Sequence, residues 1–130
     1  MKYTLTLALI LIPLSMSVAF AQVIRGDSQS GQRVYEQRCL RCHGTNLDGQ
    51  GPDSHDLIVR PTNLRSRASR SKTDWELLVA ISNGVLFSPM HSFRGTLTDQ
   101  QMLDVLSYIR SVSPPDIVSY YKKAALQHTD

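Results

Sequence analysis

The residues with the clearest chemical potential are two cysteines and a histidine in one short segment. Cys39 and Cys42 are the only cysteines, and His43 follows directly, which gives the pattern Cys-x-x-Cys-His. On a helix, residues three or four positions apart lie on one face, so the three side chains leave one turn in the same direction. The thiols can reach the two vinyl groups of one porphyrin, and the imidazole can reach its iron. The pattern therefore predicts one covalently attached haem c with its iron bound by His43.

Three other uses of the cysteine pair remain open from the residues alone. An oxidising compartment favours a disulfide between Cys39 and Cys42. A thioredoxin-like redox pair goes with a βαβ pattern, which the sequence does not show. Half a zinc site would need a second Cys-x-x-Cys or a His-x-x-x-His pair elsewhere, which the sequence also lacks. Haem attachment remains the interpretation that fits the sequence best.

The segment that carries the motif is expected to be a helix over Arg33–Arg41. One of Asp27, Ser28 and Ser30 is expected to cap its start, because short polar side chains accept hydrogen bonds from the first free N–H groups. Gly44 is expected to end it, since glycine tolerates the left-handed conformation common at helix ends.

Two further helices are expected after this one, each beginning at a capping box. Thr73 starts a helix that Gly84 ends, and Thr98 starts another that ends before Pro114 and Pro115. Apolar residues follow both boxes at helical spacing, and no alternating strand pattern appears. The sequence therefore predicts an all-α domain of three main helices with long loops.

Several positions around the motif match the pattern of one known family. Gly31 and Tyr35 lie in the first expected helix, Tyr108 lies in the last, and the glycine-rich segment 44–51 follows the histidine. Over roughly residues 31–112 the chain resembles a class I cytochrome c. The resemblance implies the small cytochrome c fold wrapped around one covalently bound haem, with the first and last helices crossing closely.

The resemblance also implies ligands on both sides of the iron. The family places a methionine in the loop before the last helix, and Met90 matches this position, 47 residues after His43. His91 stands where the family usually has proline, so ligation by His91 and an open sixth position remain alternatives. In such proteins a backbone carbonyl of the proline-led segment 61–64 accepts the N–H of the imidazole, and Pro61 is expected to supply it.

Other candidate residues are expected to have structural roles. Met102 lies in the apolar stripe of the last helix and is predicted to fill the core. Trp75 is predicted to pack in the core or on the haem, and His55 and His128 are predicted to be exposed. A basic run without acidic residues is either a solvated loop, a set of partners for the haem propionates, or a docking site for an acidic partner. It comprises Arg60, Arg65, Arg67, Arg70 and Lys72.

The beginning of the chain has the parts of a secretory signal. Lys2 precedes an apolar run that ends in Ala-Phe-Ala, a pattern that predicts a cleaved signal peptide over residues 1–21. An uncleaved membrane anchor is the alternative. The remainder divides into a cytochrome c domain over 22–115, with its core at 31–113, and a C-terminal tail over 116–130.

Length and charge limit the remaining possibilities. The chain has 130 residues and a formal charge of +3, and removal of the signal leaves 13 basic against 11 acidic side chains. This near balance does not favour nucleic acid as a partner. A small domain with few apolar residues needs a further stabilising element, and a bound haem would supply much of its core.

The expected function is single-electron transfer in a periplasm, through haem with His/Met axial ligands. The protein is then not an enzyme by itself but a shuttle, or the cytochrome subunit of a periplasmic oxidoreductase, whose partners are redox proteins such as a dehydrogenase or an oxidase. Contact with the membrane is expected only through the cleaved signal. A haem sensor or ligand-binding protein with an open sixth position is the alternative, and a haem-free dithiol protein is the third possibility.

Overall fold

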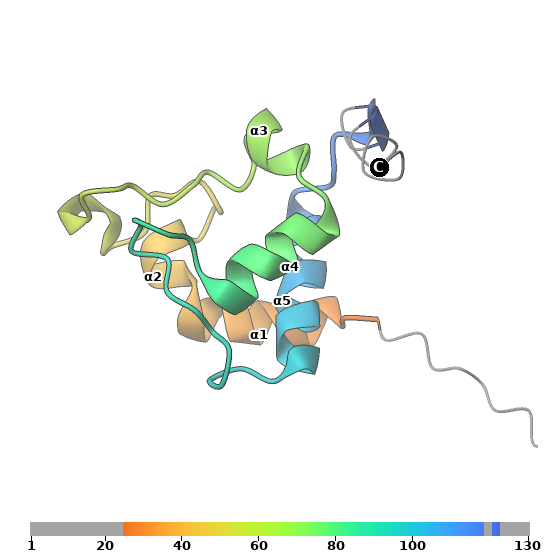
Figure 1. Ribbon diagram of the computed structural model, residues 1–130, viewed down its shortest axis with the longest axis horizontal. Helices are drawn as coiled ribbons and strands as arrows, with labels where there is room; N and C mark the ends of the chain where they lie inside the picture. The colour runs from red at the N-terminus through yellow and green to blue at the C-terminus, as the bar shows by residue number, and fades with distance from the viewer. Residues whose placement is uncertain (1–24, 119–120, 123–130) are drawn as a thin grey trace, which may run out of the picture.

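The regular secondary structure of the chain is helical. The computed structural model describes residues 25–118 and 121–122, and no strand occurs within this part. The elements in chain order are α1 (Ser28–Arg38), α2 (Leu40–His43), the 3-10 helix η1 (Ser54–Asp56), α3 (Arg67–Arg70), α4 (Asp74–Asn83) and α5 (Asp99–Val112). The prediction of an all-α domain with three main helices, here α1, α4 and α5, and long loops is confirmed (Figure 1).

Two sequence predictions concern segments at the ends of the chain. The predicted signal peptide over 1–21 and most of the tail beyond Asp116 lie outside the described residues. None of the helices that the structure describes is both long enough and apolar enough to cross a membrane.

The three main helices begin at the caps that the sequence predicts. The carboxylate of Asp27 accepts a hydrogen bond of 2.7 Å from the N–H three residues later, at the start of α1. Thr73 and Glu76 form a complete capping box at the start of α4, and Thr98 and Gln101 form one at the start of α5. These reciprocal bonds satisfy N–H groups that have no partner within the helix.

The first helix departs from the expected range of Arg33–Arg41. It runs over Ser28–Arg38, and α2 begins only at Leu40. Cys39 joins the two with φ −118°, far from the helical value of about −63°, so it interrupts the helix. The predicted end at Gly44 is confirmed, where φ is +78°. The cysteine pair therefore spans a joint between helices, with only its second member inside α2.

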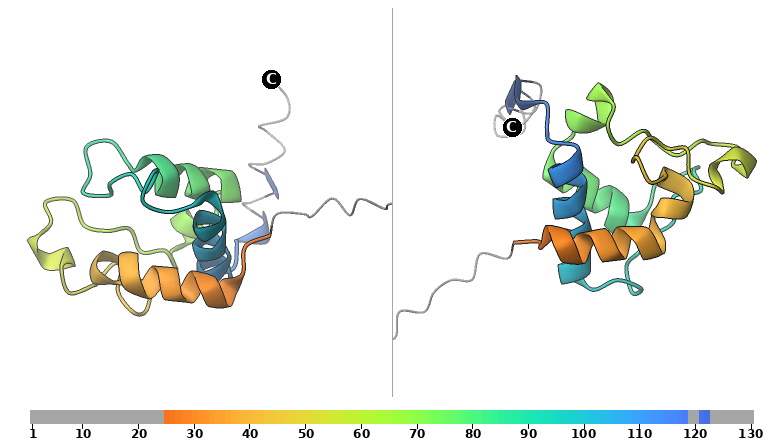
Figure 2. Two further views of the ribbon diagram at one scale, coloured as in Figure 1. Left: turned by 90° about the horizontal axis from the view of Figure 1, so that it is seen from below. Right: turned by 180° about the vertical axis from the view of Figure 1, so that it is seen from behind.

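The packing of α1 on α5 brings the two ends of the domain together (Figure 2). Gly31 is buried against α5, and a Cβ atom added there would overlap the carbonyl oxygen of Asp104. One turn further on, the rings of Tyr35 and Tyr108 lie 5.3 Å apart between centroids. The close crossing implied for Gly31 and Tyr35 is confirmed.

Replacing Gly31 with alanine is expected to destabilise the domain by about 1–3 kcal/mol, because the added methyl group must push α5 away from α1. Thermal unfolding followed by circular dichroism measures this loss. Gln37→Ala is the control, since Gln37 is exposed on the same helix. Equal unfolding midpoints for the two variants would contradict the close contact.

The core is built from α1, α4 and α5 together with the loop after α2 and the loop before α5. Leu47 and Val105 are fully buried within it, and Met102 is only 5% exposed, so the prediction that Met102 fills the core is confirmed. The buried cluster consists of Val34, Tyr35, Leu47, Ile81, Phe93, Leu97, Met102, Val105 and Ile109.

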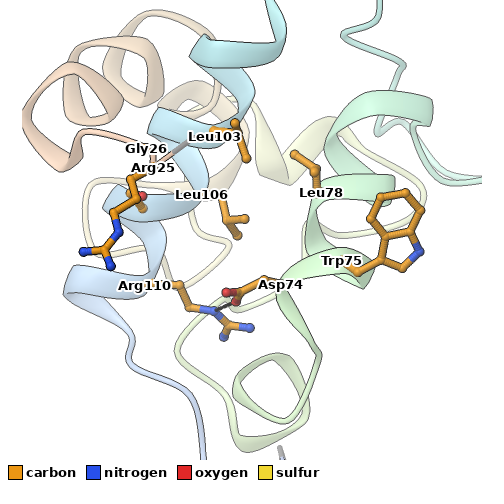
Figure 3. A pocket seen from close by; sticks show the side chains of 9 residues that line it. Arg25, Gly26, Asp74, Trp75, Leu78, Leu103, Leu106 and Arg110 are labelled. Carbon is orange, nitrogen blue, oxygen red and sulfur yellow. Dashed lines mark hydrogen bonds and ion pairs between the residues drawn. The ribbon is translucent and has the colours of Figure 1, made fainter. Parts of the chain in front are cut away.

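Trp75 is not a core residue, and the prediction that placed it there is wrong in that respect. Its side chain is 69% exposed, because α4 turns Leu77 and Ile81 toward the core instead. The residue lies at the rim of an open surface groove of about 540 Å³ between α4 and α5, which the ion pair of Asp74 and Arg110 also lines, and its indole points away from that pair (Figure 3).

Part of the predicted basic run binds the chain's own C-terminal segment. The guanidinium of Arg67 pairs with the carboxylate of Asp116 at 3.0 Å. Arg70 donates from its side chain to the carbonyl of Pro114 at 2.7 Å, and its own carbonyl accepts the N–H of Asp116 at 3.0 Å. Two of the five basic side chains thus fasten the segment that follows α5.

Candidate functional site

The Cys-x-x-Cys-His motif forms a single turn that consists of Cys39 and the whole of α2. The N–H groups of Cys42 and His43 both donate to the carbonyl of Cys39, at 3.2 and 2.9 Å. Both thiols are free, and both are partly buried. Cys39 packs against the buried cluster, and burial raises the pKa of its thiol to about 12. Burial therefore keeps the thiol of Cys39 protonated at neutral pH.

The loop after the motif folds back on α2 and binds its last carbonyl groups. Gly49 donates to the carbonyl of His43 at 2.9 Å, Gly51 to that of Cys42 at 3.1 Å, and Asp53 to that of Arg41 at 2.9 Å. The guanidinium of Arg41 also binds the carboxylate of Asp53 through two bonds of 2.7 and 2.9 Å. The short helix is thereby held rigidly, since carbonyls at a helix end otherwise lack partners.

The imidazole of His43 is oriented by the backbone. Its Nδ1 lies 3.2 Å from the carbonyl oxygen of Thr62. A carbonyl can only accept, so this contact puts the ring proton on Nδ1 and leaves the lone pair of Nε2 available for a metal. The pKa of His43 is lowered, because the effect of burial is larger than that of the bond to Thr62, which raises it. The neutral form of the ring, which can bind a metal, is therefore favoured.

The prediction that Pro61 supplies this carbonyl is wrong, because the acceptor is the carbonyl of the next residue, Thr62. The carbonyl of Pro61 is turned toward Gly49, where a Cβ atom would overlap it. Gly49 has φ +81°, so its lack of a side chain serves both the turn and this close approach. The proline therefore supports the loop, while Thr62 binds the imidazole.

A buried tyrosine ties α1 to the end of the motif. The hydroxyl of Tyr35 donates to the carbonyl of Gly44 at 2.7 Å, and Tyr35 is only 1% exposed. Desolvation raises the pKa of this phenol, so it remains a donor at any physiological pH. The position of α2 is thus coupled to the crossing of α1 and α5.

Tyr35→Phe is expected to lower the free energy of unfolding by about 1–2 kcal/mol, because the buried carbonyl of Gly44 loses a hydrogen bond. Denaturant titration measures the change. Tyr108→Phe removes the hydroxyl from the other ring of the pair and is the matched control. The prediction is contradicted when both variants lose the same stability.

The second predicted ligand lies in the loop between α4 and α5. Met90 is partly buried and packs against the same cluster as Cys39. Its backbone is fixed on both sides, since its N–H donates to the hydroxyl of Ser88 at 3.1 Å and its carbonyl accepts the N–H of Val85 at 2.9 Å. Gly84 packs closely against this loop, because a Cβ atom added to it would come within 2.6 Å of the carbonyl oxygen of Met90.

His91 has a different environment from its neighbour. It is exposed, and its ring lies against that of Phe93 with centroids 4.5 Å apart. Phe93 is buried and belongs to the core, whereas His91 covers it from outside. His55 is exposed in η1, as predicted, and His128 lies outside the described residues.

These residues fit a haem c. Two thiols and an imidazole share one turn, the imidazole is already oriented by a carbonyl, and a thioether lies in a loop against the same core. In both views of Figure 2, this loop and the loop after α2 reach the same end of the molecule. Sequence reasoning missed the carbonyl of Thr62 and the role of Gly84, because neither acts through a side chain.

Comparison with known proteins gives a consistent result. The family model described as Cytochrome c matches residues 28–113. A cytochrome c of Nigella damascena is 24% identical over 106 residues, which cover 71% of this chain and 96% of that protein. A cytochrome c-550 of Virgibacillus halodenitrificans is 48% identical over 27 residues, which cover 21% of this chain and 77% of that protein.

A solved structure has a similar fold. It is a chain of the Kuenenia stuttgartiensis reducing HAO-like protein complex Kustc0457/Kustc0458, with a TM-score of 0.58 and 26% identity. The match covers 80% of this chain but only 46% of that one, so this chain spans about half the length of the solved protein. With the family model matching two thirds of its residues, the chain belongs to the cytochrome c family, the electron-transfer proteins that carry covalently bound haem c.

Proposed function

We propose that this protein carries single electrons in a periplasm through one haem attached at Cys39 and Cys42, with His43 and Met90 as axial ligands. The observation that carries the proposal is the bond between His43 and Thr62, which leaves the second ring nitrogen free to bind iron. The signal-like start of the chain and the bacterial cytochrome c-550 among its relatives support export.

Three features of the chain would support electron transfer: the carbonyl that orients His43, the hydrogen bonds that hold the loop of Met90, and the thioether itself. Haem, when bound, supplies an iron that changes oxidation state by one electron. The carbonyl of Thr62 keeps the imidazole in one tautomer and orientation. The hydrogen bonds of Ser88 and Val85 hold the loop of Met90 in place, which limits rearrangement when the charge of the site changes. A soft, neutral thioether favours the reduced iron and raises the potential.

Visible spectra of the protein, expressed in a periplasm with the haem attachment machinery, test this proposal. Low-spin bands in both oxidation states, with the weak far-red band of methionine-bound ferric haem, are expected. A low-spin spectrum without that band would indicate His91 as the ligand. A high-spin spectrum with rapid binding of carbon monoxide would indicate a ligand-binding protein, and no Soret band would indicate a haem-free dithiol protein.

Two arrangements of the carrier are consistent with the proposal, a free shuttle and a subunit of an oxidoreductase. The Kuenenia protein of similar fold is part of a complex, which supports the subunit arrangement for this chain. Native purification separates them, because a stoichiometric complex that survives high salt would exclude the free shuttle.

A further inference from the structure

The groove between α4 and α5 lies where the described part of the chain begins. It has a volume of about 540 Å³, and Arg25 and Gly26 line it together with side chains of both helices. In Figure 3, two leucines of α5 lie between Arg25 on one side and Leu78 of α4 on the other. These leucines are Leu103 and Leu106. The chain therefore enters the domain along one wall of this groove.

The first described residues are fixed against α5 through their backbone. The side chain of Gln100 donates to the carbonyl of Arg25 at 3.1 Å. The N–H of Asp27 donates to the carboxylate of Asp104 at 2.8 Å. Between these two bonds lies Gly26, where an added Cβ atom would overlap the backbone of α5. Any residue that precedes Arg25 therefore starts beside the groove.

The lining of the groove suits an apolar occupant. The two charged side chains that α4 and α5 contribute to it, Asp74 and Arg110, bind each other at 2.7 Å. The rest of the lining from these helices consists of one tryptophan, one serine and three leucines. Leu78 and Leu103 are only partly buried, so an apolar side chain placed between them would remove more of their surface from water.

We propose that the groove holds the chain's own N-terminal arm, which we define as Gln22, Val23 and Ile24. These residues lie outside the described part of the chain, and removal of residues 1–21 leaves them alone ahead of Arg25. The inference rests on the proposed function, because only export with removal of the signal makes the arm this short. Two of its three side chains are apolar, as the lining of the groove requires.

The length of the arm matches the distance that it must cross. An extended chain advances about 3.3–3.6 Å per residue, so three residues span roughly 10 Å. The axes of packed helices lie about 8–10 Å apart. The arm can therefore run from Arg25, beside α5, across the groove to Leu78 on α4, with Val23 and Ile24 over the leucines between them.

The covalent attachment of the arm favours it over any other occupant. Arg25 is already held beside α5, so only three more residues lose conformational freedom. A tethered segment meets its site at an effective concentration in the millimolar range, which a free partner does not reach. Arg25 and Cys39 stand at opposite ends of α1, so the arm would leave the loops of the proposed haem site uncovered (Figure 2). The arm would thus join α4 to α5 and add apolar contacts to a small domain.

A double-mutant cycle on the exported holoprotein tests the contact. Ile24→Ser, Leu103→Ser and the double variant are compared with the unchanged protein by thermal unfolding. Ile24→Ser should lower the unfolding midpoint by about 5 °C, because an apolar side chain loses its burial. The double variant should lose clearly less than the sum of the two single losses, since either change alone already breaks the contact. Strictly additive losses would overturn the proposal.

Two further measurements keep the result specific. Ile117→Ser is the matched control, since Ile117 is 64% exposed in the C-terminal segment, and it should leave the midpoint unchanged and add to Leu103→Ser without coupling. The contact should also be visible without any substitution, as nuclear Overhauser effects between methyl groups of the arm and those of Leu78 or Leu103 in the reduced protein. Their absence would overturn the proposal even where a variant fails to fold.

The intact mass of the exported protein separates this inference from the proposed function. A chain that starts at Gln22 and carries haem, but lacks these contacts, would overturn only the docking of the arm. A chain that still starts at Met1 would overturn the removal of the signal together with this inference. Contacts that vanish on dilution, as a dimer dissociates, would replace the chain's own arm with that of a second copy.

Discussion

Met90→Ala is expected to leave haem attached and to open the sixth position of the iron. The proposed attachment residues, Cys39 and Cys42, lie in another part of the fold, so the mass of the covalent adduct should change only by the substitution. Loss of the thioether should lower the potential by an amount on the order of 0.1 V or more, within the ~0.8 V that axial ligands span. Redox titration measures the potential, and carbon monoxide binding to the reduced protein reports the open position.

His91→Ala is the control for that experiment. The ring of His91 is exposed and lies against Phe93, so its removal should leave the potential and the far-red band unchanged. An unchanged potential in Met90→Ala, together with a shift in His91→Ala, would refute Met90 as the ligand and favour bis-histidine ligation.

Gly84→Ala is expected to displace the loop of Met90 and weaken the sixth ligand. A Cβ atom at residue 84 would come within 2.6 Å of the carbonyl oxygen of Met90 and 2.8 Å of the N–H nitrogen of Ser92, and both are backbone atoms that cannot rotate away. The loop must shift, or α4 must end differently. The far-red band of the ferric protein should then weaken or disappear, and the protein should lose about 2 kcal/mol of stability through strain and crowding.

Gly95→Ala separates crowding from backbone strain. Gly95 has φ +86° against +76° at Gly84, so both substitutions force alanine into the left-handed region. No atom lies within 4 Å of a Cβ at residue 95. Gly95→Ala should therefore lose stability from strain alone and keep its far-red band. Similar spectra for the two alanine variants would contradict the role of Gly84.

Local signals in the sequence predicted much of the fold. The capping boxes at Thr73 and Thr98 depend on residues three positions apart, and the structure has both. The crossing at Gly31 was predicted only through resemblance, because no local pattern indicates which distant helix packs there. The break at Cys39 was missed, since a change in one φ angle leaves no mark in composition or spacing.

Other features depended on tertiary structure and could not be predicted. Thr62 meets His43 through a carbonyl, an atom that every residue carries. Trp75 lies at helical spacing with buried residues, but spacing does not show where the neighbouring helix lies, and the indole is exposed. The pairing of Arg67 with Asp116 joins residues 49 positions apart, a separation at which opposite charges alone predict nothing.

The packing of Cys39 has a kinetic consequence for the export that we propose, in which the chain would emerge from its N-terminus first. This cysteine precedes α5 by 60 residues, yet the cluster that covers it includes Val105 and Ile109 of that helix. While α5 is still to come, the thiol is not covered and its pKa is not raised by burial, so covalent modification meets the least resistance. Once the last helix docks, the same thiol is shielded. If the chain is exported as proposed, this thiol is thus accessible before the last helix docks and shielded afterwards.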